Sequence, residues 1–266
     1  MRQVVALGSG DAFSSAGRAN TAWLVEDGAP ACAVDFGPTA LLAMKKLGHD
    51  PRALAAVHFT HLHGDHIGGW PLLLVDAVYR ARRSEPLDVT GPPGTAERLQ
   101  ALWSASYADA AARPLPFELR IRELSPGEAA DVCGRRIETL RAEHQRPPHV
   151  ALMLRLTGPA GTIAFTGDTG PQEGLFGLAR GAALLCAECT ELRAPPEAES
   201  RDPGASRRHL AWDDLRAALP RLEVRRIALG HLGAEVRREA ASIEAEAHAA
   251  GRDLRVCDDG TAVPLD

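Results

Sequence analysis

The stretch that decides the fold is His61-Leu62-His63-Gly64-Asp65-His66. In an extended segment, His61 and His63 would present their side chains on the same face, so both could reach one ion. Gly64 allows the chain to turn sharply before Asp65 and His66. Imidazoles and a carboxylate are ligands that zinc, iron and manganese take in proteins. Such a cluster is costly to pack without an ion, because protonated histidines repel one another. The stretch therefore predicts a metal site.

A metal pair needs more ligands than this stretch supplies, and further candidates occur where apolar segments end. His144, Asp168, His231 and Asp35 each follow a segment that we interpret as a strand. Taken singly, each histidine has an ordinary interpretation as a surface or core residue, and Asp168 has one as a turn residue. Active sites gather where strands end, so the shared placement favours one common site.

The order of the predicted elements indicates an α/β fold with helices outside two sheets. We expect strands over residues 4–7, 22–26, 31–34, 55–59, 87–89, 117–124, 128–132, 136–141, 150–156, 162–165, 182–185, 224–229 and 254–256. We expect helices over residues 38–47, 70–83, 94–106, 175–180, 212–219 and 234–249. Residues 1–266 are expected to form a single domain with two similar halves, about 1–130 and 131–266.

The charge balance bears on the class of substrate. The formal net charge is -5, and the arginines occur as scattered pairs and not as a basic stripe. A dedicated nucleic-acid binder usually carries a basic excess or stripe. The composition is compatible with a small anionic substrate and disfavours a long RNA.

The cysteines and the apolar segments bear on location. The five cysteines are odd in number and irregular in spacing, which argues against a disulfide framework. Cys186-Ala-Glu-Cys189 follows an apolar run, and we interpret it as part of a buried strand and not as a redox or zinc motif. The N-terminal apolar stretch is too short for a signal peptide, and no apolar run is long enough to span a bilayer. We expect a cytoplasmic protein with no membrane partner.

These residues together resemble the metallo-β-lactamase superfamily, and the resemblance covers nearly the whole chain. It implies a four-layer αββα sandwich with two metal ions in a groove along one edge. It also implies a role for each residue. The first metal would be held by His61, His63 and His144, the second by Asp65, His66 and His231, with Asp168 as the bridge and Asp35 orienting the motif loop.

Two further segments resemble one branch of that superfamily. The opening 7–13, followed by 17–21, is similar to the start of ribonuclease Z and related phosphodiesterases. Those enzymes pair a glutamate after a buried strand with a histidine near the metals, and Glu188 and His209 match this pair. The resemblance implies that His209 assists phosphate binding and leaving-group protonation. Asp65 would take part in proton transfer. The alternative for His209 is a surface residue at a helix entry.

The chain also departs from ribonuclease Z. Those enzymes project a glycine- and proline-containing arm that grips transfer RNA, typically between the third-motif histidine and the bridging aspartate. Here only residues 145–167 separate His144 from Asp168, and most of them form one predicted hairpin. This favours a small phosphodiester, such as a cyclic nucleotide or a phosphonate-derived cyclic ester.

We therefore expect a hydrolase of phosphodiesters with two divalent metal ions. Zn²⁺ is the first choice, and Mn²⁺ or Fe are the alternatives, because histidine and aspartate ligands do not select one metal. A hydrolase of carboxylic esters, thioesters or lactones is the second hypothesis, and a metal-binding or ligand-sensing protein without activity is the third. A homodimer to which the helix over 70–83 contributes is also expected.

Overall fold

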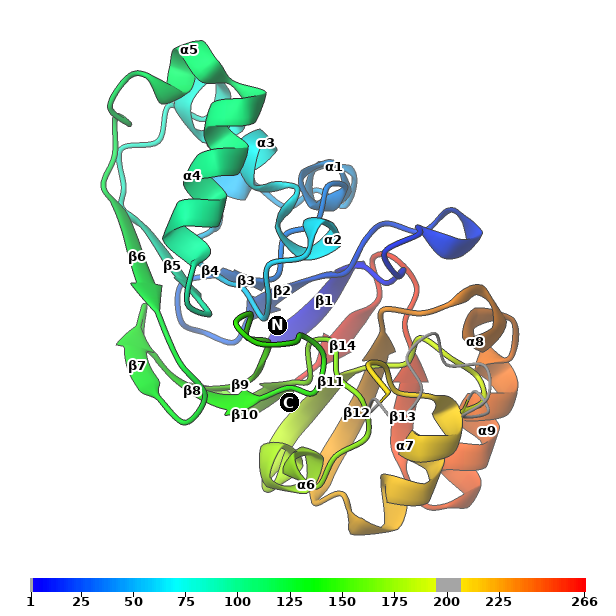
Figure 1. Ribbon diagram of the computed structural model, residues 1–266. Coiled ribbons are helices and arrows are strands. Elements are labelled where there is room, and N and C mark those ends of the chain that lie inside the picture. Colours follow the sequence, from blue (N-terminus) through cyan, green and yellow to red (C-terminus); the bar gives the residue numbers. More distant parts are fainter. Residues whose placement is uncertain (1, 195–206) are drawn as a thin grey trace.

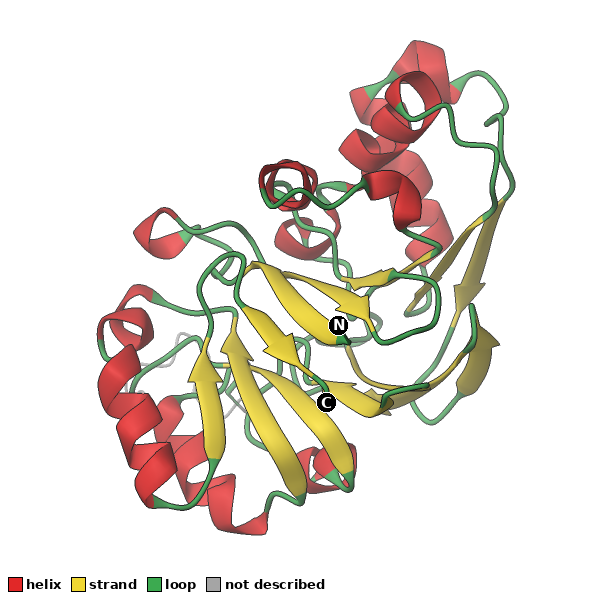
Figure 2. Cartoon of the chain, turned by 180° about the vertical axis from the view of Figure 1, so that it is seen from behind, coloured by secondary structure: helices red, strands yellow, loops and turns green. Residues whose placement is uncertain are grey.

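Two β-sheets pack face to face, and helices cover the outer side of each sheet (Figure 1). The computed structural model describes residues 2–194 and 207–266. Figure 2 shows from behind that the strands of both sheets lie between two groups of helices. This is the four-layer αββα sandwich that the sequence predicted.

The first sheet has seven strands in the order β14-β1-β2-β3-β4-β5-β6. The pairs from β14 to β3 are antiparallel, and those from β3 to β6 are parallel. Its strands are β1 (Gln3–Gly8), β2 (Ala22–Glu26), β3 (Cys32–Val34), β4 (Ala56–His58), β5 (Leu87–Gly91), β6 (Leu119–Glu123) and β14 (Ala262–Pro264). The strand β14 thus joins the sheet that begins the chain.

The second sheet also has seven strands, in the order β13-β12-β11-β10-β9-β8-β7. The pairs from β13 to β10 are parallel, and those from β10 to β7 are antiparallel. Its strands are β7 (Ala129–Val132), β8 (Arg135–Arg141), β9 (Leu152–Gly158), β10 (Gly161–Phe165), β11 (Ala182–Glu188), β12 (Val224–Gly230) and β13 (Asp253–Val256).

The helices divide between the two outer layers (Figure 1). The first sheet is covered by α1 (Ala40–Lys46), α3 (Trp70–Val75), α4 (Thr95–Ser106) and α5 (Ala108–Ala111). The second is covered by α6 (Gly174–Ala179), α7 (Trp212–Ala218), α8 (Ala234–Arg238) and α9 (Ala240–Ala249). The short α2 (Gly64–Ile67) follows β4, and single 3₁₀ turns lie at Ser15–Gly17, Pro51–Ala53 and Leu219–Arg221. Among the described residues, no helix has the length and apolarity needed to cross a membrane.

Three apolar layers hold the sandwich together. Side chains of both sheets, including Val34 and Leu184, form the middle layer. Trp70 and Trp103 belong to the layer between the first sheet and its helices, and Trp212 and Ile243 to the corresponding layer of the second half. Strands buried on both faces are rich in apolar residues without strict alternation, as expected for parallel strands under helices.

Two predicted helices are shorter than expected. The helix predicted over 70–83 ends at Val75 and continues as a π-helical turn, Asp76–Arg80, in which the amide of Ala81 donates to the carbonyl of Asp76 at 2.7 Å. The helix predicted over 234–249 breaks at Glu239 into α8 and α9. The strand β14 was not predicted, because three residues that end in proline carry little strand signal.

The topology brings several strand ends to one edge of the sandwich. β3 is parallel to β4, and β10, β11 and β12 are parallel to one another. β8 and β10 both pair antiparallel with β9, so β8 has the direction of β10. Ligands of open α/β sheets bind at the carboxyl ends of strands. The predicted site residues lie at the ends of these strands, in the loops after them, or in α2, which follows β4.

Candidate metal centre

The motif loop leaves β4 and passes directly into α2. His61 is fully buried, and its Nε2 lies 3.1 Å from Nδ1 of His63. The same Nδ1 of His63 lies 3.0 Å from Nε2 of His144, which follows β8 on the other sheet. His61, His63 and His144, here called the first ligand set, therefore point their nitrogens at one small volume.

A second group of side chains meets beside the first. Nε2 of His66 lies 3.2 Å from Oδ2 of Asp65, and Nε2 of His231 lies 3.4 Å from the same oxygen. His231 follows β12, so this group also joins the two sheets. Asp65, His66 and His231 are here called the second ligand set.

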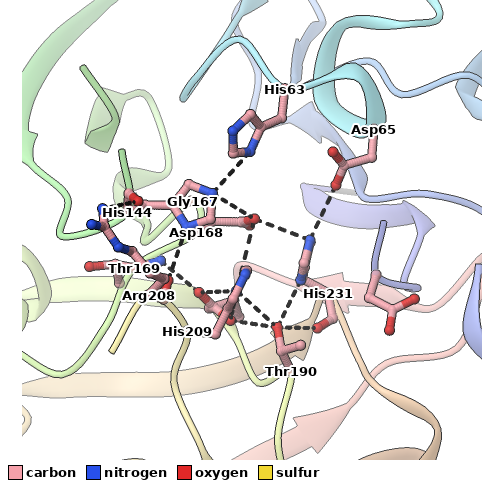
Figure 3. Close-up of polar contacts among 12 residues, drawn as sticks. His63, Asp65, His144, Gly167, Asp168, Thr169, Thr190, Arg208, His209 and His231 are labelled. Atoms are coloured by element: carbon pink, nitrogen blue, oxygen red, sulfur yellow. Dashed lines mark hydrogen bonds and ion pairs between the residues drawn. The ribbon is translucent and has the colours of Figure 1, made fainter. Parts of the chain in front are cut away.

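The carboxylate of Asp168 lies between the two sets (Figure 3). Its Oδ2 is 3.8 Å from Nε2 of His61 and 3.7 Å from Nε2 of His144, both in the first ligand set. The same oxygen is 3.2 Å from Nε2 of His231, and Oδ1 is 3.3 Å from Nε2 of His66, both in the second. One aspartate is thus within reach of both sets.

Two buried atoms at this centre have no hydrogen-bond partner, although they lie close together. They are Nε2 of His66 and Oδ1 of Asp168. Buried polar atoms in folded proteins are nearly always paired, so each such exception requires an explanation. Nitrogen and carboxylate oxygen atoms that converge without bonding one another fit a divalent cation between them.

Burial sets the charge of the first ligand set. It lowers the pKa of His144 to about 4, and it lowers the pKa of the other two histidines of the set below their ordinary value. These imidazoles stay neutral at neutral pH, as a metal ligand must. Burial alone would lower the pKa of His66 and His231, but the surrounding carboxylates, Asp168 first among them, together raise both. The same carboxylates would also favour a divalent cation at this place.

A layer of hydrogen bonds holds the ligands from outside. Asp35, 1% exposed, accepts from the amide and the hydroxyl of Thr60, each at 2.8 Å, and from Nδ1 of His66 at 2.8 Å. Nδ1 of His144 donates to the carbonyl of Arg208 at 3.0 Å. Asp35 has a left-handed backbone, with φ of 58°, which is strained for a residue with a side chain. That Asp35 orients the motif loop, as the resemblance implied, stays a prediction.

Glu188 and His209 form a pair next to the two ligand sets. Nδ1 of His209 lies 3.1 Å from both carboxylate oxygens of Glu188 and 4.0 Å from Oδ2 of Asp168. Burial alone would lower the pKa of His209, but nearby carboxylates, Glu188 first and then Asp168 and Glu191, raise it to about 9. These carboxylates favour the protonated form of His209, whose side chain remains 28% exposed.

The structure thus brings together all of the predicted site residues. Sequence reasoning gave no role to Thr190, which closes the segment 188–190 and whose hydroxyl contacts both Glu188 and His231. A threonine after a strand is ordinary, and its partner His231 lies 41 residues away, so the sequence indicated no contact between them.

A family model and curated relatives both match most of this chain. The family described as "Anti-Pycsar protein Apyc1" matches residues 2–199. A ribonuclease Z of Mycobacterium bovis is 32% identical over 194 residues, which cover 70% of this chain and 69% of that protein.

Solved structures share the fold at low identity. The metallo-β-lactamase fold protein YhfI from Bacillus subtilis has a TM-score of 0.76 at 19% identity, with 98% of each chain covered. The short form of human tRNase Z has a TM-score of 0.75 at 18% identity, with 99% of each chain covered. The chain therefore belongs to the Apyc1 family, within the ribonuclease Z-like branch of the metallo-β-lactamase superfamily, and is a metal-dependent hydrolase.

Proposed function

We propose that this protein hydrolyses small or cyclic phosphodiesters with two divalent cations, Zn²⁺ being the first choice. The observation that carries the proposal is the position of Asp168 between two ligand sets, with the Glu188–His209 pair beside them. The first ligand set would hold one cation, the second would hold the other, and Asp168 would bind both. When bound, such a metal pair makes hydroxide available at neutral pH and offsets the charge that develops on the attacked phosphorus.

The remaining steps fall to side chains. Asp65 accepts a proton from the attacking water, since its carboxylate lies at the exposed side of the second ligand set. Oxygen attacks phosphorus, and the bond from phosphorus to the leaving oxygen breaks. His209, protonated and held by Glu188, gives its proton to that leaving oxygen. The products are a phosphomonoester and a hydroxyl group, which in a cyclic substrate belong to one molecule.

The short segment between His144 and Asp168 favours the proposal of a small substrate. It holds the strands β9 and β10, joined by the two-residue turn 159–160, and no projecting arm. The net charge of -5 also disfavours a long polyanion. The relatives named ribonuclease Z support phosphodiester chemistry, because the backbone of RNA is a phosphodiester.

A substrate comparison on protein loaded with Zn²⁺ or Mn²⁺ tests the proposal. We expect turnover of bis(p-nitrophenyl) phosphate and of cyclic nucleotides, and little cleavage of a precursor transfer RNA. A panel of thioesters, carboxylic esters and lactones serves as the comparison. Cleavage of that panel without any phosphodiester turnover would overturn the proposal in favour of the ester-hydrolase alternative.

A further inference from the structure

Thr190 occupies the junction between the second ligand set and the Glu188–His209 pair (Figure 3). Its hydroxyl oxygen lies 2.6 Å from Oε2 of Glu188 and 2.9 Å from Nδ1 of His231. The carbonyl of His231 is farther away, at 3.2 Å, and Nδ1 of His209 lies at 3.3 Å. No other described side chain touches both Glu188 and His231 through one atom at these distances.

The hydrogens of these contacts can be assigned from the heavy atoms. Nε2 of His231 faces Asp65 at 3.4 Å and Asp168 at 3.2 Å, so Nε2 is the atom that would bind a cation. The ring proton then sits on Nδ1, which donates to the Thr190 hydroxyl. A hydroxyl has one proton to donate, and the short contact to Glu188 is where it goes.

The Glu188 carboxylate is the acceptor at the end of this series of hydrogen bonds. It accepts from the amide of Thr169 at 2.6 Å and from Nδ1 of His209 at 3.1 Å, in addition to Thr190. The donors therefore run from His231 to Thr190 to Glu188, and from His209 to the same carboxylate. A buried carboxylate, 3% exposed, anchors a metal ligand and the proton donor together.

The backbone makes this arrangement rigid. His231 has a left-handed φ of 50°, and its carbonyl and ring both face Thr190. A side chain at position 233 would meet the carbonyl of Thr190 at 2.2 Å, so the two loops pack backbone against backbone with Gly233 between them. The backbone around the Thr190 side chain is therefore closely packed.

We propose that Thr190 is a positioning residue. It fixes the ring orientation of His231 and keeps the ring proton on Nδ1, and it holds the Glu188 carboxylate in contact with Nδ1 of His209. The inference rests on the proposed function, because it takes His231 as a metal ligand and His209 as the proton donor. Outer partners of metal-binding histidines fix tautomer and orientation, and their loss typically costs about 10–100-fold in metal affinity or activity.

Thr190→Val tests the inference, because valine keeps the branched shape and removes only the hydroxyl. Zn²⁺ titration against a chelating competitor should show one cation bound as in the unchanged protein and the other about 10–100-fold more weakly. The kcat for bis(p-nitrophenyl) phosphate should fall at saturating Zn²⁺, and Thr190→Ser should restore both. Thr157→Val is the matched control, since its hydroxyl pairs with Thr162 on the exposed side of the second sheet.

Unchanged affinity for both cations and unchanged kcat in Thr190→Val would overturn the inference. A measurement on the unmodified chain covers the case in which that variant does not fold. The ¹⁵N NMR spectrum of the Zn²⁺-loaded protein should show His231 protonated at Nδ1, and a proton-free Nδ1 would also overturn the inference. If the unmodified chain binds fewer than two cations or hydrolyses no phosphodiester, the proposed function itself has failed.

Discussion

Arg135→Met should strongly destabilise the protein without changing its chemistry. The guanidinium of Arg135 makes two hydrogen bonds to the carboxylate of Asp27, at 2.6 and 3.2 Å, and a third to the carbonyl of Pro30 at 2.7 Å. Both charged side chains are 0% exposed. Asp27 follows β2 of the first sheet and Arg135 begins β8 of the second, so the pair ties the sheets together.

The magnitude follows from burial. Methionine keeps much of the arginine's volume but leaves the Asp27 carboxylate buried without its partner, which costs about 3–5 kcal/mol. In a chain of this size each kcal/mol lowers the melting temperature by about 2–4 °C, so a loss of about 6–20 °C is expected. Combining Arg135→Met with Asp27→Val should recover part of that loss, because no unpaired charge then remains.

Thermal unfolding of the metal-free proteins, followed by circular dichroism, measures this. Arg52→Met is the control, since Arg52 pairs with Asp50 at the surface and its loss should leave the midpoint nearly unchanged. β2 runs antiparallel to β1 and β3, so the Asp27 pair lies at the edge opposite the metal centre. Metal content and kcat of the folded variant should therefore be unchanged. A loss below about 1 kcal/mol, or a double variant no more stable than Arg135→Met, would refute the reasoning.

Three further predictions concern single side chains. Asp168→Ala should prevent binding of a metal pair, because both ligand sets lose the carboxylate that they share; elemental analysis that still finds two ions per chain would count against that role. His209→Ala should keep its metals and lower kcat by about 10²–10⁴-fold, the usual contribution of a general acid, and unchanged turnover of bis(p-nitrophenyl) phosphate would make His209 an ordinary surface residue. His58→Gln should make stability less sensitive to acid. Burial lowers the pKa of His58 to about 3, so below about pH 6.5 the unfolded chain binds a proton that the folded chain does not. Stability then falls by about 1.4 kcal/mol per pH unit toward pH 3. Urea unfolding at several pH values should show that slope reduced in the variant, and identical slopes would contradict the assignment.

The candidate ligands could be chosen from the sequence because their chemistry is local. His61, His63, Asp65 and His66 lie within six residues, and their spacing alone indicates a metal site. Asp168 could be added because polar residues after buried strands meet at one sheet edge. The fold class followed from the order of strands and helices.

The rest depends on contacts between residues far apart in sequence. Asp27 and Arg135 are 108 residues apart, and no sequence pattern next to either residue indicates that its side chain has a buried partner. The π-helical turn after Val75 also depends on tertiary packing, since its buried Asp76 pairs with Lys45 of α1. The homodimer stays a prediction.

The centre has a consequence for how much of this protein a cell contains. Its ligands come from loops of both sheets, so on the proposed assignment each cation that binds also strengthens the folded state by mass action. Scarcity of the metal would then raise the unfolded fraction that proteases remove. The abundance of the enzyme, and not only its rate, would follow the supply of the metal.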